Sequence, residues 1–268
     1  CIRDRGYIKQ YDNFSFGTYI QYIKPNKNIN SSISQTEFSL DLYHQRSVDG
    51  EYGNGIGTFF NYKFQYRDSS SLNFKCYCNI IRGKDYEETR KFPSAPFIEK
   101  LSGAKLMVEY ESPRTNKIQS IYKASAGSFG YETETENLDL RNESYSVGYS
   151  NIFKPSGLFK LNIGWFDYQK KSNWSIWRKE NLFGYYDKEQ ISSSLSLDYF
   201  ISSNQEFRIK GKIYAIKAKN PRSYRVSSSG YMNASIDNTN AFQLSETAFQ
   251  IRYKYEFSPL SNLYVVYT

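Results

Sequence analysis

The stretch Phe249-Gln-Ile-Arg-Tyr-Lys-Tyr-Glu-Phe257 alternates an apolar or aromatic residue with a polar or charged residue at every position. Successive side chains of a β-strand point to opposite faces, so this pattern predicts a strand with one apolar face and one charged face. Residues 55–67 and 190–201 repeat the alternation over a similar length. The same local signal at distant points in the chain predicts a sheet built from many such strands.

The predicted strands are long. They exceed the roughly 5–6 residues of a typical soluble strand, and they reach the roughly 9–11 residues that a tilted strand needs to cross a bilayer. The alternation places strands at 14–24, 33–44, 55–67, 71–82, 102–112, 117–128, 141–153, 157–170, 190–201, 204–219, 241–257 and 262–268.

The connections between these strands alternate in length. Tight turns rich in Pro, Ser or Asn are expected at 68–70, 112–116, 154–156, 202–203 and 258–261. Longer loops are expected at 45–54, 83–101, 129–140, 171–189 and 220–240. This rhythm is typical of outer-membrane barrels, which combine short periplasmic turns with longer extracellular loops. A soluble β-sandwich is the alternative, because alternation also fits a half-buried sheet.

The composition agrees with a membrane barrel. Mean hydropathy is −0.68 and no apolar run is long enough for a membrane helix, yet 18% of the residues are aromatic. A barrel exposes only alternate residues to lipid, so a low mean hydropathy is expected for it. The sequence therefore predicts an all-β fold, an antiparallel transmembrane β-barrel in meander order with about 12 strands.

We expect residues 1–268 to form one barrel domain. The chain stops within Leu263-Tyr-Val-Val-Tyr-Thr268, which predicts an incomplete barrel with strands missing at one or both ends.

The net charge of +8 does not indicate nucleic-acid binding, because the basic residues are scattered and form no compact patch. Residues opposite the apolar face should line the lumen, where cations outnumber anions and would favour anionic or polar solutes. The expected lumen-lining residues are Asn61, Lys63, Arg67, Lys75, Lys105, Arg208, Lys210, Lys212, Arg252, Lys254 and Glu256. The alternative is that these charges pair with one another or with a plug.

Reactive residues are few. His44 is the one histidine, and no Ser or Asp partner for it can be nominated from spacing. It could serve a barrel-wall hydrolase or lie at the membrane rim as an interfacial residue. Cys76 and Cys78 share one strand face and are not expected to form a disulfide with each other. Cys1 is either an acylated lipoprotein terminus or the start of a fragment.

Acidic residues cluster on two of the predicted loops. They could bind Ca²⁺ or bridge lipopolysaccharide through divalent ions, or they could be solvated loop charge. They are Glu87, Glu88, Glu132, Glu134 and Glu136. We expect no catalytic residue, resident metal or cofactor.

The end of the chain resembles a bacterial family that joins an N-terminal carbohydrate-binding-module-like β-sandwich to a C-terminal outer-membrane barrel. The stretch from Phe249 to Tyr267 is similar to that family's penultimate hairpin, an Arg/Tyr-rich strand, a Pro-containing turn and a Leu-Tyr-Val-Val-Tyr strand. Phe207-Arg-Ile-Lys-Gly-Lys-Ile-Tyr-Ala-Ile-Lys-Ala218 resembles a second segment. The resemblance covers 190–268 and implies an outer-membrane barrel, without the sandwich domain and without catalytic residues.

The expected function is a channel or porin-like protein for polar or anionic solutes in the outer membrane of a Gram-negative bacterium. Its partners would be outer-membrane lipid, lipopolysaccharide and other envelope proteins. Heavy use of Lys, Asn, Ser and Tyr is typical of AT-rich genomes such as those of Bacteroidetes. The first alternative is a barrel scaffold in a larger envelope complex for secretion, uptake or electron conduction. The second is a barrel-wall hydrolase.

Overall fold

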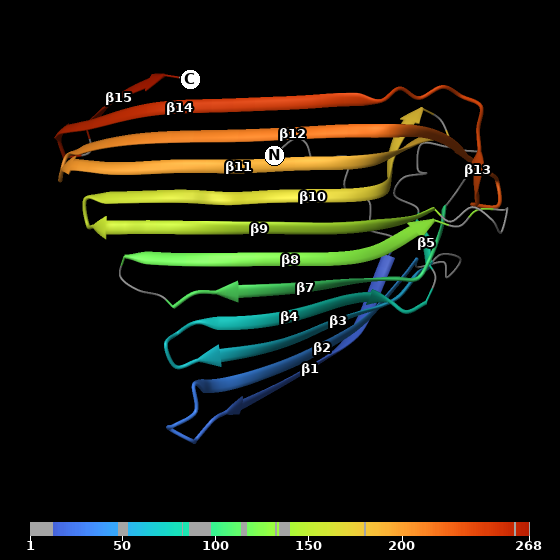
Figure 1. Cartoon of the computed structure of the whole chain (residues 1–268), viewed down its shortest axis with the longest axis horizontal. Helices are drawn as coiled ribbons and strands as arrows, with labels where there is room; N and C mark the ends of the chain where they lie inside the picture. The colour runs from blue at the N-terminus through green and yellow to red at the C-terminus, as the bar shows by residue number, and fades with distance from the viewer. Residues whose placement is uncertain are drawn as a thin grey trace.

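A computed structural model of the chain describes residues 13–47, 53–81, 83–85, 98–113, 117–131, 133, 140–179, 181–259 and 261–267. All its named elements are β-strands, and they join in one antiparallel 15-stranded sheet (Figure 1). The described residues contain no helix long and apolar enough to cross a membrane.

The long strands follow one another across the sheet in chain order, so the sheet is a meander. They are β1 (Asn13–Pro25), β2 (Ile33–Ser47), β3 (Gly53–Tyr66), β4 (Ser71–Asn79), β7 (Gly103–Glu111), β8 (Ile118–Tyr131), β9 (Leu140–Ser156), β10 (Phe159–Lys179), β11 (Leu182–Ser202), β12 (Gln205–Val226), β14 (Phe242–Ser258) and β15 (Ser261–Tyr267). Three short strands join the sheet beside this path: β5 (Gly83–Asp85), β6 (Ile98–Lys100) and β13 (Met232–Ala234). Every strand predicted from the alternation is present, which confirms the predicted all-β antiparallel meander.

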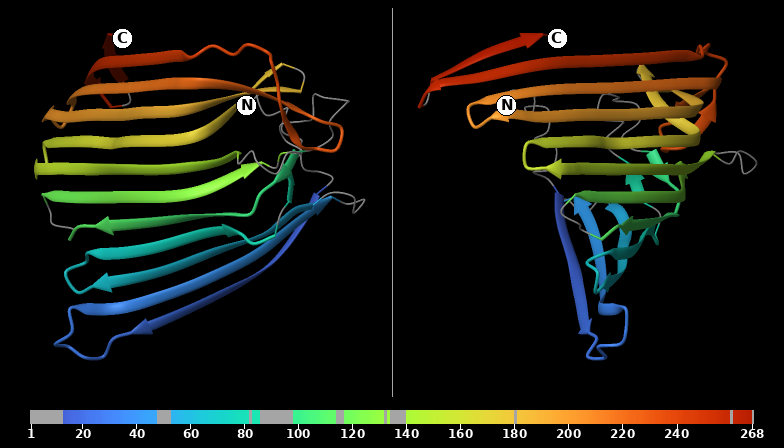
Figure 2. Two further views of the ribbon diagram at one scale, coloured as in Figure 1. Left: turned by 45° about the vertical axis from the view of Figure 1, so that its right-hand side comes forward. Right: turned by 60° about the vertical axis from the view of Figure 1, so that its left-hand side comes forward.

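The sheet has two different ends. Short turns lie at one end, which we call the turn end, whereas β5 and β13 lie at the other, the loop end (Figure 1). The sheet is also strongly curved. In the right-hand view of Figure 2, β8 to β14 run across the picture while β1 to β4 are steeply inclined to them. Adjacent twisted strands accumulate this kind of rotation along a sheet. Within the described residues, β1 and β15 each pair with one neighbour, so the sheet is open at both edges.

The turn between β3 and β4 shows how the short connections are fixed. The Asp68 carboxylate accepts hydrogen bonds from the Ser70 amide at 2.9 Å and from the Ser70 hydroxyl at 2.6 Å. These bonds hold the pKa of the Asp68 carboxyl below its ordinary value. Ser69 between them has a φ of 69°, in the left-handed region that tight turns use.

The hairpin of β10 and β11 corrects one prediction. Residues 171–189 were expected to form a long loop, but the two strands continue through them and end only at Lys179 and Leu182. Register shifts lie between Lys171 and Trp174, and between Trp177 and Lys179. Both shifts insert a residue in β10 and change the phase of its side-chain alternation. In β11, Leu182 to Tyr186 are all buried, so this end of the strand lacks the alternation of apolar and polar residues. Residues 220–240 were likewise expected to be a loop, yet β12 continues to Val226 and β13 lies within the same range.

The buried apolar core lies at the loop end and not between two sheets. It joins the ends of β9, β11 and β12 to the short strands β6 and β13, and Tyr131 of β8 packs against it. Its members are Ile98, Leu140, Phe183, Tyr185, Tyr224, Val226 and Met232. No second sheet packs face to face on the meander in the part of the chain that is described. The soluble-sandwich alternative is therefore not the fold.

A row of aromatic rings packs at the loop-end half of the first strands. Tyr43 is paired in register with Gly57, and its ring stacks on Tyr77 with centroids 6.3 Å apart. Tyr77 in turn contacts Phe129, with centroids 5.7 Å apart. An ideal Cβ on Gly57 would lie 2.4 Å from Cζ of Tyr43, so the ring occupies the space that the missing side chain leaves.

Substituting Gly57→Ala should lower the free energy of unfolding by about 1–3 kcal/mol, because the new methyl group overlaps the Tyr43 ring. Denaturant unfolding of the purified protein measures this change. Gly157→Ala is the matched control, since nothing lies within 4 Å of its Cβ position. The control should change stability by less than ~0.5 kcal/mol. Equal stability of the two variants would contradict the packing described here.

Candidate functional site

The two faces of the sheet differ in polarity and in exposure. Along β7 alternate residues are exposed, and Leu106 has 61% of its surface accessible. Val108 and Tyr110, on the same face, are also exposed. Lys105 and Glu109 point to the opposite face and are half-buried. We call the apolar exposed side the outer face and the polar side the inner face. Water-soluble proteins rarely expose a continuous apolar surface of this kind, so the outer face needs an apolar environment.

The apolar part of the outer face ends at a row of charged residues toward the loop end. Lys170, Glu189 and Lys217 are register partners across β10, β11 and β12, and they share the outer face. From this row toward the turn end, outer positions of β11 run from Ile191 to Tyr199. That interval is close to the roughly 9–11 residues that cross a bilayer. We call it the apolar band.

Two networks of ion pairs connect charged side chains of the inner face. On the N-terminal side, Lys75 Nζ lies 3.4 Å from Oε1 of Glu109, and Lys123 Nζ lies 3.0 Å from Oε2 of the same residue. Lys123 also lies over the Trp165 ring, 4.1 Å from its centroid. One carboxylate of β7 thus holds an ammonium from each neighbouring strand.

A second network joins β11, β12 and β14 near the turn end. Arg208 pairs with Asp198 and, at 2.7 Å, with Glu206. Arg252 pairs with the same Glu206 oxygen at 3.1 Å. Lys254 lies 3.5 Å from Glu256 farther along β14. These pairs fix the inner side chains of the three strands relative to one another.

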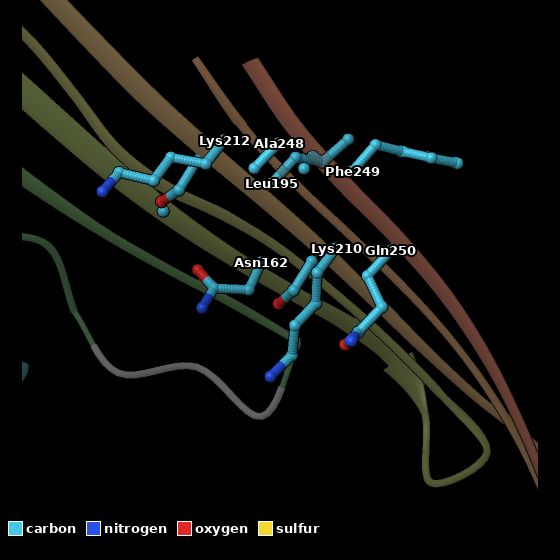
Figure 3. Close-up of a pocket in the computed structure, with 11 residues that line it drawn as sticks. Asn162, Leu195, Lys210, Lys212, Ala248, Phe249 and Gln250 are labelled. Carbon is cyan, nitrogen blue, oxygen red and sulfur yellow. The ribbon is translucent and has the colours of Figure 1, made fainter. Parts of the chain in front are cut away.

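Between these networks the inner face is hollowed by a cavity of about 490 Å³ over β10, β11, β12 and β14. Figure 3 shows Asn162, Lys210, Lys212 and Gln250 projecting to one side of the sheet, and Phe249 projecting to the other. The remaining inner positions are small, so the hollow stays open. They are Gly164, Ser194, Ser196 and Ala248. Within the described ranges, neither lysine has a carboxylate within ion-pairing distance.

A further row of lysines crosses the inner face toward the loop end. The register runs from Lys105 to Gly127, then to Ser144, Lys171 and Lys188. Side chains in one row of a sheet are cross-strand neighbours. Gly127 and Ser144 are small, so the Lys105 side chain can extend over them toward Lys171. The row places one lysine each from β7, β10 and β11 along one line of the inner face.

Lys188 is the most enclosed of the three, with 7% of its surface exposed. Its ammonium donates hydrogen bonds to Oε1 of Gln169 at 2.7 Å and to Oε1 of Gln190 at 2.9 Å, and it lies 4.9 Å from the Trp174 ring centroid. It lies on the loop-end side of Glu189, beyond the apolar band. Burial lowers the pKa of the Lys188 ammonium to about 8, and the like charge of Lys171 acts in the same direction. Asp167 opposes the shift.

The structure places all but one of the predicted lumen residues on the inner face. The exception is Arg67, which lies in the turn after β3. Its guanidinium donates to the backbone carbonyls of Ser31, Asn26 and Asn28 and thereby holds the β1–β2 turn. Arg67 was assigned to the lumen because it continues the odd-numbered series of polar residues in β3. The strand ends at Tyr66, so the alternation of side chains between the two faces does not extend to Arg67. A lumen-lining role for the others stays a prediction.

Several inner-face residues were not predicted. Lys123 has the right parity on a predicted strand, so the same rule could have found it. Lys171 and Lys188 lie in the range expected to be a loop, where no face could be assigned. The carboxylates Asp198 and Glu206 also have the right parity, but their pairing with arginines depends on a register that sequence does not supply.

The remaining candidates have a simpler placement. His44 lies near the loop end of β2 and packs edge-on against Phe16, with ring centroids 5.3 Å apart. The Sγ atoms of Cys76 and Cys78 lie 3.1 Å apart on the outer face without a disulfide.

Among the described residues, no three His, Cys, Asp or Glu side chains gather in a way that could hold a metal. The acidic loop residues Glu87, Glu88, Glu132, Glu134 and Glu136, and Cys1, lie outside the described residues.

Comparison with known proteins gives a family and a distant structural likeness. The model of the family described as Domain of unknown function (DUF5916) matches residues 2–268. No curated protein matches the chain significantly. The crystal structure of the siderophore receptor PiuA from Acinetobacter baumannii is similar with a TM-score of 0.43 and 9% identity, over 95% of this chain and 48% of that chain. The chain therefore spans about half the length of that structure.

The ion pairs of the inner face make a stability prediction. Glu206→Gln removes the carboxylate that Arg208 and Arg252 share, and its side chain is only 14% exposed. The loss in unfolding free energy should be about 1–3 kcal/mol, as for hydrogen bonds to charged groups. Glu189→Gln is the control, because its pair with Lys219 is 37% and 44% exposed and should contribute less than ~1 kcal/mol. Chemical denaturation of both variants measures the difference. Equal losses would show that the shared carboxylate has no special role.

Proposed function

The chain belongs to the DUF5916 family, and we propose that it forms the wall of an outer-membrane β-barrel that conducts polar, preferentially anionic solutes. The single observation that carries this proposal is the inverted polarity of the sheet. Its apolar side chains are the exposed ones, and its charged side chains are half-buried on the opposite face. A single sheet can be stable with this arrangement when lipid covers the outer face and water fills the inner side.

The outer face supports a membrane location. An apolar strand segment that ends in a charged row matches the depth of a bilayer and its polar boundary. Lys217 and Lys170 of that row are exposed, so lipid phosphate groups and lipopolysaccharide are suitable neighbours for them. We infer an outer-membrane location in a Gram-negative bacterium from this pattern, and we retain the Bacteroidetes assignment as a compositional prediction.

The inner face supports conduction of anions. Three of its carboxylates, Glu109, Asp198 and Glu206, are engaged with arginines or lysines. Lys210 and Lys212 remain beside an open hollow without a carboxylate partner in the described part of the chain. Their summed field raises the local concentration of anions over that of cations.

The alternative function, a barrel scaffold, needs the same barrel wall as a channel but no water-filled pore through it. The folded loop end, where β6 and β13 pack on the ends of the long strands, offers other envelope proteins a place to bind. The hydrolase function has weaker support, because His44 packs against Phe16 on the apolar side of β2. The carbohydrate-binding module of the resembling family has no counterpart in the family match, so sugar binding is not proposed.

Reversing the charge of inner-face lysines should reverse or weaken anion preference without abolishing folding. The test variant is Lys63→Glu, Lys210→Glu and Lys254→Glu, and the measurement is the reversal potential of the intact protein in planar bilayers under a salt gradient. We expect the ratio of anion to cation permeability to fall by roughly two-fold or more. High salt should shrink the effect, because the Debye length falls from about 10 Å at 0.1 M to about 3 Å at 1 M.

The matched control changes the same net charge outside the lumen. Lys24 and Lys217 lie on the outer face, Lys27 lies in the β1–β2 turn, and all three are exposed, so the control is Lys24→Glu, Lys27→Glu and Lys217→Glu. This variant should keep the wild-type reversal potential. A pore with unchanged selectivity in both variants, or no pore in the wild-type protein, would defeat the channel and leave the scaffold function.

A further inference from the structure

The row of Lys105, Lys171 and Lys188 differs from the ion-paired lysines of the inner face. Lys75 and Lys123 have a carboxylate, that of Glu109, between them. Along this row the intervening residues are Gly127 and Ser144, which carry no charge. The Lys188 ammonium donates to two neutral amide oxygens and lies near an aromatic ring, and the carboxylate that acts on its charge is Asp167 of β10.

Three like charges in one row are unfavourable in the unliganded protein. The charge of Lys105 acts on Lys171, and the charge of Lys171 acts on Lys188. Burial adds to this cost, because desolvation disfavours the charged form of a lysine. An anion placed between the ammonium groups would relieve both effects at once. The arrangement is therefore complementary to a compact group of high negative charge.

The surroundings favour a tetrahedral oxyanion over a planar carboxylate. Lysine ammonium groups act as point charges with freely rotating donors, whereas arginine offers the planar fork that suits a carboxylate. No arginine belongs to this row. Ser144 adds a hydroxyl between the lysines; it donates to the Gly127 carbonyl at 3.4 Å and would have to rotate to donate to an oxyanion oxygen.

We propose that Lys105, Lys171 and Lys188 form a binding site for a phosphate group, either of inorganic phosphate or of a phosphorylated solute, on the loop-end part of the inner face. The site rests on the proposed function, in that solutes reach the inner face from the loop end. Through this site the barrel would prefer phosphate-bearing solutes over other anions. Lys210 and Lys212, farther toward the turn end, act only as general positive charge.

The site should lose affinity as Lys188 loses its proton. With its pKa at about 8, Lys188 is mostly charged below that pH and mostly neutral above it. The charged groups that act on it are Lys171 and Asp167 of β10, and Lys105 of β7 acts on Lys171. On its own strand, Tyr186 lies beneath the guanidinium of Arg178 from β10. The β12 residues of the same face, Ile216 and Ala218, are uncharged. Anion binding therefore weakens as the pH rises through about 8, because positive charge is lost.

The test is calorimetric titration of the detergent-solubilised intact protein with inorganic phosphate and with sulfate. Sulfate keeps a constant charge between about pH 7 and about pH 9.5, so any pH effect on its binding comes from the protein. We expect saturable binding of both anions. Lys171→Gln with Lys188→Gln should raise the dissociation constant about tenfold or more, which equals a loss of about 1.4 kcal/mol. Lys188→Arg should keep sulfate binding at the higher pH, because arginine stays charged.

The control is Lys210→Gln with Lys212→Gln, which removes the same charge from the same face and should change the dissociation constant less than about twofold. Equal weakening in the two double variants would overturn the site, and so would a wild-type protein that binds neither anion. Bilayer conductance of the same samples tests the proposed function separately. Phosphate binding without conductance contradicts the channel alone, whereas conductance without phosphate binding contradicts the site alone.

Discussion

Backbone hydrogen bonding across one uninterrupted sheet is the constraint on which the other features of this molecule depend. Each strand pairs with its chain neighbour, so the polar backbone groups are satisfied within the sheet and the side chains are sorted to two faces. Because no second sheet covers the meander in the described ranges, the sorting leaves the apolar residues of β7 exposed. The polar backbone is concealed while the apolar side chains are not, which is the requirement for contact with lipid.

The charges of the inner face follow from the same sorting. A lysine on the apolar band would cost roughly 2–4 kcal/mol near the bilayer midplane, so cations belong on the other face. There, cross-strand neighbours decide what each cation does. Lys75 and Lys123 share Glu109 and stabilise the wall, whereas Lys105 and Lys171 are separated by the uncharged Gly127 and Ser144 and belong to the proposed anion site. The register thus separates the ion-paired lysines from those of the proposed site.

The alternation of residues was enough to predict every long strand and the face of residues such as Lys63 and Lys210. It failed where alternation itself is broken. Bulges in β10 near Lys171 and Trp177 hid the loop-end half of that strand, and the continuous burial of Leu182 to Tyr186 hid the loop-end part of β11. The end of β3 at Tyr66 places Arg67 in a turn and not on the inner face. Ion pairs such as Arg208 with Glu206 could not be predicted, because they depend on how strands are aligned. For the same reason the lysine row became visible only with the register.

The exposure of the outer face to lipid can be measured directly along β7. Single cysteines introduced in turn at positions 103 to 111, in a protein whose own cysteines are replaced by alanine, would carry a nitroxide label in reconstituted vesicles. Its collision rates with oxygen, which concentrates in lipid, and with a water-soluble nickel chelate report the surroundings of each position. A lipid-facing outer face predicts two opposed period-two patterns, with oxygen highest at Leu106 and Val108 and nickel highest at Lys105 and Glu109. Nickel access equal at all these positions would contradict a membrane-embedded sheet.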